Sequence, residues 1–172
     1  MSMNNTSVME LPPGSVTQAS RGLLSRMFAD PHLLELEERR DLVAQLRQAV
    51  TEYPEIAELR VLLGMALCVN FEVQPAIEAF RTAVSLAPQS FIAHLKMGEL
   101  WMRLRVVDKA DEHTRQAGLV ARNAAQSELA RRQGASIRAM RRAGIERGGY
   151  KSPLALFGRL RRLLAPRPSA VA

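Results

Sequence analysis

The side chains that could perform chemistry are few and lie far apart along this chain. The histidines are His32, His94 and His113, and no cysteine or carboxylate accompanies them at the spacing of a metal site. The single cysteine, Cys68, lies in an apolar stretch without a basic neighbour, which predicts an inert small hydrophobic residue rather than a nucleophile. Nothing in the sequence pairs a general base with a nucleophile. These observations favour a protein that is not an enzyme and that uses no metal, cofactor or small-molecule substrate.

The composition favours helices and divides the chain by charge. Apolar residues make up 47% of the 172 residues, but aromatic residues only 5%, so we expect a core of Leu, Ala, Val and Met. Residues 1–122 carry a net charge of −2, whereas residues 123–172 carry +9. A basic block of this kind is typical of a segment that faces an anionic partner. No apolar run reaches the roughly 18 residues of a membrane span, and residues 1–20 lack a signal-peptide pattern, so we expect a cytoplasmic protein.

Two stretches of the chain, Ala57–Ser90 and Phe91–Ala124, match each other at a period of 34 residues. A period of this length indicates an array of helical repeats, which usually presents an extended binding surface. Glycine inside a helix costs about 1 kcal/mol, so we expect Gly64 and Gly98 to allow a close approach between helices. The residues that the repeat predicts to pack the helix pairs are Leu63, Gly64, Leu67, Ala76, Phe80, Ala83, Gly98, Trp101, Ala110 and Ala117.

These positions resemble the tetratricopeptide repeat (TPR), whose signature Ala57–Ser90 matches well and Phe91–Ala124 matches partly, with Thr114 in place of an aromatic residue. The resemblance implies an all-α fold, a short α-solenoid of antiparallel helix hairpins. It also implies a concave groove lined by the first helix of each repeat, and no carboxylate clamp, because Val61 and Met65 stand at the clamp positions. Carried over, the groove residues are Glu58, Val61, Met65, Cys68, Val69, Ile92, Leu95, Glu99, Met102 and Arg103.

Pro, Gly and capping residues divide the chain into elements. We expect a disordered tail over 1–20, a helical domain over 21–147 and a separate tail over 148–172. Within the domain, helices are expected over 20–29, 30–52, 55–69, 74–86, 90–104, 108–123 and 124–146. Residues 23–56 would form a degenerate repeat. The last helix would act as a C-terminal cap over 124–147, with Leu129, Gln133, Ile137 and Met140 on one stripe.

The C-terminal tail has an amphipathic pattern of its own. Gly148 and Gly149 predict a hinge, because no phosphate-binding glycine pattern surrounds them. On a helix over 154–164, five large apolar side chains would form one stripe, with arginines beside it. The surface that this predicts contains Phe157, Arg159, Leu160, Arg161 and Arg162. Such a helix suits an anionic membrane surface, an acidic partner or docking on the chain's own domain.

Three functions remain open from the sequence. The first is a non-catalytic scaffold that binds another protein, as a peptide or amphipathic helix, in an apolar concave groove. The second is a peripheral membrane-associated scaffold anchored by the basic tail. The third, a nucleic-acid-associated protein, is less favoured because no aromatic platform accompanies the arginines.

Overall fold

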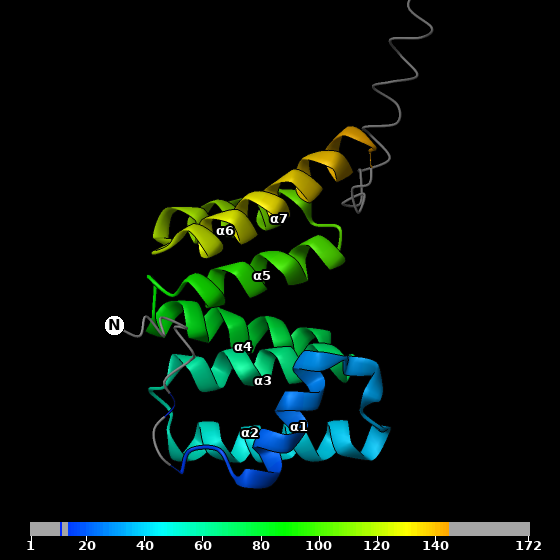
Figure 1. The fold of residues 1–172 in the computed structure, drawn as a ribbon, viewed down its shortest axis with the longest axis vertical. Coiled ribbons are helices and arrows are strands. Elements are labelled where there is room, and N and C mark those ends of the chain that lie inside the picture. Colours follow the sequence, from blue (N-terminus) through cyan, green and yellow to red (C-terminus); the bar gives the residue numbers. More distant parts are fainter. Residues whose placement is uncertain (1–10, 12–13, 145–172) are drawn as a thin grey trace, which may run out of the picture.

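The computed structural model describes residue 11 and residues 14–144, which form an all-α stack without any strand (Figure 1). The helices are α1 (Gln18–Ala29), α2 (Leu36–Glu52), α3 (Ala57–Val69), α4 (Val73–Leu86), α5 (Phe91–Arg103), α6 (Val107–Val120) and α7 (Ala124–Arg142), with a 3₁₀ turn, η1, at Pro31–Leu33. Helices α2 and α7 lie at opposite ends of the stack, and α1 crosses in front of α2 and α3 in this view. The expected all-α solenoid of antiparallel hairpins is confirmed.

The two helix pairs α3–α4 and α5–α6 contain the two sequence repeats. Each pair closes over a glycine in its first helix: a Cβ added to Gly64 would lie 2.8 Å from the Phe80 ring. A Cβ added to Gly98 would lie 2.7 Å from Thr114 Oγ1, one repeat later. In both pairs the two helices therefore approach so closely that only glycine, which has no Cβ, fits at this position. All ten residues predicted to pack the pairs are buried.

The region before the first full repeat is more ordered than the sequence suggests. Residues 14–20, expected in a disordered tail, are part of the fold: Ser15 and Val16 are buried, and the Thr17 side chain caps α1 by accepting from the Ser20 backbone N–H. Ser20 also donates to the Gln45 side chain on α2. This polar contact joins residues that are far apart in the sequence. The composition of residues 14–20 alone therefore could not predict it.

The single helix expected over 30–52 is also wrong, because the chain bends within it. Asp30 caps only the short turn η1, accepting from the His32 N–H at 2.9 Å. Leu34 then adopts an extended conformation and is 1% exposed. A capping box starts α2, in which the Glu35 N–H donates to the Glu38 carboxylate at 2.9 Å. Burial of Leu34 between two capping signals explains why η1 and α2 stay separate.

Helix α7 covers the end of the array with most of the expected stripe, in which Leu129 is wrong. Its buried residues are Ala130, Gly134 and Ile137, whereas Leu129 is 49% exposed. The small residues Ala130 and Gly134 let α7 approach α6 closely, which a leucine would prevent. Gln133 donates from Nε2 to the Leu95 carbonyl on α5 at 3.1 Å, so α7 also binds the first helix of the preceding pair.

Candidate functional site

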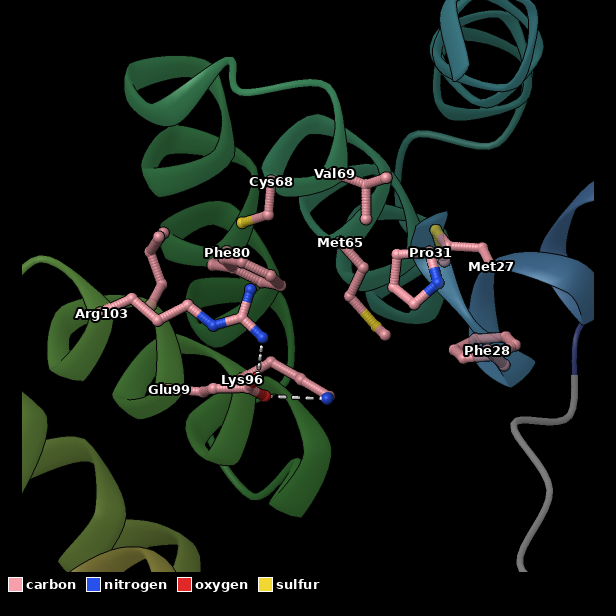
Figure 2. A pocket seen from close by; sticks show the side chains of 11 residues that line it. Met27, Phe28, Pro31, Met65, Cys68, Val69, Phe80, Lys96, Glu99 and Arg103 are labelled. Carbon is pink, nitrogen blue, oxygen red and sulfur yellow. Dashed lines mark hydrogen bonds and ion pairs between the residues drawn. The ribbon is translucent and has the colours of Figure 1, made fainter. Parts of the chain in front are cut away.

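A hollow of about 200 Å³ lies between α3 and α5 and is closed on one side by α1 and η1 (Figure 2). Met65, Cys68 and Val69 come from α3, and the Phe80 ring from α4 forms part of the lining. The remaining lining residues are Met27, Phe28 and Pro31 near the N-terminus and Lys96, Glu99, Leu100 and Arg103 on α5. We call this surface the α3–α5 hollow. Three of its side chains, Met27, Met65 and Cys68, contain the polarizable sulfur atoms that suit adaptable apolar contacts.

The N-terminal wall of the hollow could not be placed from the sequence. Met27 and Phe28 belong to an apolar stripe that predicts a short helix, but the stripe does not indicate which surface that helix covers. In the structure Met27 is 3% exposed and joins the core, while Phe28 is 55% exposed beside the hollow. An ion pair between Arg26 and Glu38 of α2 holds the end of α1 in place. Arg26 also donates to the Leu33 carbonyl at 2.5 Å.

The α5 side of the hollow carries a three-residue charge cluster. Glu99 pairs with Lys96 at 2.9 Å and with Arg103 at 2.7 Å. Burial acts to raise the pKa of Glu99, but the hydrogen bonds and positive charges of Lys96 and Arg103 outweigh it and hold the pKa below its usual range. The cluster has one acid and two bases, so it gives this side of the hollow a net charge of +1.

Cys68 lies in the hollow but is not activated there. Burial raises the pKa of its thiol to about 11, although the positive charge of Arg103 acts in the opposite direction. A thiol of this kind is almost entirely protonated at neutral pH, and the thiolate is the reactive form. Cys68 therefore contributes apolar surface rather than a nucleophile to the hollow.

Five of the ten residues predicted for the groove line this hollow: Met65, Cys68, Val69, Glu99 and Arg103. Glu58, Ile92 and Met102 are partly exposed but lie outside it. The placement of Val61 and Leu95 in the groove is wrong. Val61 is 0% exposed within the main core, and Leu95 is 7% exposed and packs with Ala117 and Ala130. The arrival of α7 on this part of α5 explains the burial of Leu95. The predicted tail residues Phe157–Arg162 lie outside the described residues.

The structure brings together two histidines that the sequence does not associate. His94 on α5 and His113 on α6 place their Nδ1 atoms 3.4 Å apart, with ring centroids at 5.6 Å. The other ring nitrogen of His94 lies 3.0 Å from the Pro88 carbonyl oxygen. In the part of the chain that the structure describes, no group of three or more His, Cys, Asp or Glu side chains could hold a metal ion. The pair is a contact within the α5–α6 hairpin.

Comparisons with known proteins show which known fold this architecture resembles. No family model matches the sequence, and no curated protein matches it. The structure is similar to the TPR2B domain of yeast Sti1, solved in a complex with pHsp70, with a TM-score of 0.60 over 70% of this chain and 94% of that domain. The chain has a TPR-like helical repeat fold. At 14% sequence identity, this similarity concerns the fold alone.

A second solved structure supports the same TPR-like architecture. It is a protein in a T3SS complex from Aeromonas hydrophila, with a TM-score of 0.58, 16% identity, and coverage of 74% of this chain and 84% of that one. The TPR-like stack also has no membrane-spanning candidate: none of the helices described over residues 14–144 is long and apolar enough to cross a bilayer.

Proposed function

We propose that this protein is a scaffold that binds a segment of another protein, a peptide or amphipathic helix, in the α3–α5 hollow. The observation that carries the proposal is the hollow itself, since the TPR-like fold leaves a partly exposed apolar surface where two repeats meet. The two similar structures described above are of complexes, one with pHsp70 and one a T3SS complex, which is consistent with this kind of role.

The lining of the hollow indicates what kind of segment would fit. Met65, Cys68 and Val69 provide apolar contacts, and flexible thioether side chains adapt to differently shaped apolar partners. The Lys96–Glu99–Arg103 cluster adds one unbalanced positive charge at the edge. A helix with a stripe of large apolar residues and an acidic residue beside that stripe would satisfy both features.

The test begins with peptides selected on the full-length protein from a displayed library, whose affinities are then measured by fluorescence anisotropy. Met65→Glu would place a charge in the apolar lining, and we expect it to reduce the affinity at least about tenfold. Met140→Glu is the matched control, because Met140 is also partly buried but lies on α7. We expect the control to bind the selected peptides as the wild type does.

Two outcomes would count against this function. The first is equal binding of the selected peptides by wild type and Met65→Glu, with both proteins folded by circular dichroism. The second is binding of the selected peptides at a surface outside the hollow. Hydrogen exchange would then show that the protection of the backbone amides of α3 and α5 does not change when a peptide binds. Because Val61 and Leu95 are core residues, substitutions there would report on folding rather than binding.

The membrane-associated alternative depends on residues 154–164, which lie outside the described residues. We propose it as the alternative to binding in the α3–α5 hollow, and the same protein preparations can distinguish the two. Anionic liposomes should pellet the full-length chain but not a 1–147 truncation if the tail is an anchor. Binding of selected peptides that survives this truncation would instead support the hollow as the functional site.

A further inference from the structure

The C-terminal end of the array presents a second surface with a different character. Residues 115–144 contain seven arginines, no lysine and a single acidic residue, Glu128. All seven arginines are exposed: Arg115, Arg122, Arg131, Arg132, Arg138, Arg141 and Arg142. The positive charge of the folded part of this end therefore lies mainly on helix α7, in addition to the basic residues that follow it in the sequence.

A hollow of about 390 Å³ lies along the contact between α6 and α7. Arg115 of α6 and Arg131 and Arg138 of α7 line it. Gly118 and Gly134 also line it, and small residues there leave room between the helices. Leu119, which is 72% exposed, adds an apolar side chain to the same lining. We call this surface the α6–α7 hollow; none of its lining residues belongs to the α3–α5 hollow.

Internal ion pairs neutralise only part of this charge. Glu128 binds both Arg131 and Arg132 at 2.7 Å, and hydrogen bonds from these arginines lower its pKa to about 2. Arg115 and Arg138 have no ion pair among the described residues. Asp111 is the only carboxylate in the lining of the hollow. The α6–α7 hollow therefore keeps an excess of positive charge that an anionic ligand could balance.

We infer that the α6–α7 hollow binds an acidic segment of a partner protein, one that carries glutamate or aspartate residues and an apolar residue for Leu119. Guanidinium groups pair with carboxylates through two parallel hydrogen bonds, so the exposed arginines of this hollow suit a segment that carries carboxylates. With Arg115 on α6 and Arg131 and Arg138 on α7, carboxylates of a segment lying between the helices would meet guanidinium groups from both of them.

Two observations favour a protein segment over other polyanions. A membrane surface would need several large apolar side chains free to insert, but Leu119 is the only large apolar side chain in the lining of this hollow, and Ile137 of α7 is buried against the array. Binding of single-stranded nucleic acid usually relies on aromatic rings for base stacking, and no aromatic residue lines this hollow. A hollow with one exposed leucine between arginines instead matches a peptide of mixed acidic and apolar character.

The experiment uses the full-length chain and a fluorescein-labelled peptide of Glu, Asp and Leu residues that is 14 residues long, the length of α6. Arg115→Glu with Arg138→Glu reverses two charges that no described ion pair uses, and we expect the affinity to fall about tenfold or more. Arg21→Glu with Arg81→Glu is the matched control, since both residues are exposed and lie elsewhere. It should leave the affinity nearly unchanged. Leu119→Ser should weaken binding without lowering the thermal stability.

Several outcomes would overturn this inference. Equal loss of binding in the two double variants would mean that the peptide senses only net charge. Unchanged binding in Arg115→Glu with Arg138→Glu, with the helical circular dichroism signal retained, would mean that the hollow is not the site. Tighter binding of polyuridine RNA or of phosphatidylserine vesicles than of the peptide would assign the surface to those ligands. Met65→Glu, which alters only the α3–α5 hollow, should leave acidic-peptide binding intact, so the two proposals can fail separately.

Discussion

Phe71 and Arg105 occupy the same place in consecutive helix pairs, and both hold a left-handed backbone conformation, with φ angles of 63° and 59°. Each follows the first helix of its pair. The Glu72 N–H donates to the Leu67 carbonyl at 2.9 Å, and the Val106 N–H donates to the Trp101 carbonyl at 2.9 Å. These hydrogen bonds end the helix in the manner that usually requires glycine. Both helix pairs therefore contain the same turn geometry, although neither has glycine, the residue type that favours it.

Arg105→Gly should stabilise the protein. A side chain in the left-handed region costs about 1–2 kcal/mol, and glycine removes that cost but loses more backbone entropy on folding, so we expect a net gain of roughly 0.5–1 kcal/mol. Urea denaturation would measure it. Gln116→Gly, at an exposed position inside α6, should instead destabilise by a similar amount. Equal destabilisation by both glycines would contradict the strain at Arg105.

Gly64→Ala should destabilise the α3–α4 pair. The added Cβ would lie 2.8 Å from the Phe80 ring, and a buried aromatic ring cannot move away without disturbing its neighbours, so we expect a loss of roughly 1–3 kcal/mol. Gly118→Ala is the matched control. The nearest atom to its Cβ is the Ala130 Cβ at 3.8 Å, and alanine should stabilise α6 there. Thermal denaturation would measure the stability of both variants. A Gly64→Ala variant as stable as the wild type would contradict the close contact between this position and the Phe80 ring.

The contact between His94 and His113 should make stability depend on pH. Burial, together with the electrostatic effect of the neighbouring His94, lowers the pKa of His113 below its usual value of 6.5. Since the unfolded chain then binds the proton more readily, stability is complete above about pH 6.5 and falls as the pH drops toward the lowered pKa. Glu112 opposes this shift and Lys109 adds to it.

His113→Asn provides the comparison for this pH dependence. Carboxylates also titrate in acid, so the informative quantity is the difference between wild type and variant in the free energy of unfolding. That difference should change as the pH falls below about 6.5 and stay constant above pH 7. A difference that is the same at every pH would show that His113 does not carry the effect.

Cys68 should react slowly with alkylating reagents. At pH 8 a thiol with a pKa of about 11 has about 100-fold less thiolate than one with the ordinary value of 9.0. Thiolates of higher pKa are intrinsically more nucleophilic, which recovers part of this loss and leaves a rate about tenfold below that of an ordinary thiol. Mass spectrometry of the native protein with iodoacetamide would measure the rate. Urea should restore it to that of an unfolded chain, and a fast native reaction would contradict the burial of Cys68.

The helix pairs could be predicted because their signals are local. Gly64 and Gly98 recur at a fixed spacing, and Ser90 marks the start of α5, where its side chain accepts from the Ala93 N–H at 3.4 Å. The bend at Leu34 was missed because its extended backbone depends on burial rather than on a turn residue. Leu129 was misplaced for a related reason, since periodicity favours the larger apolar residue while the close approach of α7 to α6 requires Ala130.

The α3–α5 hollow could be predicted only on its α3 and α5 sides. Met65 and Val69 follow from the resemblance to the TPR family, but the wall formed by Phe28 and Pro31 depends on where α1 crosses the stack. The His94–His113 contact was likewise hidden, because two histidines 19 residues apart meet only once the hairpin is known. Neither arrangement has a spacing that single-sequence periodicity detects.

Gln133 fits α7, rather than a further helix pair, to the end of the α5–α6 pair, and so limits the number of repeats. Where the first pair has the Phe80 ring over Gly64, the second pair has Thr114 over Gly98, and the space is completed by the Gln133 amide from α7. An extra helix pair inserted after α6 would bring a different side chain to this place and remove the hydrogen bond that the Leu95 carbonyl accepts from Gln133. The helix after α6 is therefore not interchangeable with a generic repeat. Lengthening this protein would require Thr114 and Gln133 to be replaced together, for example by restoring an aromatic residue at Thr114.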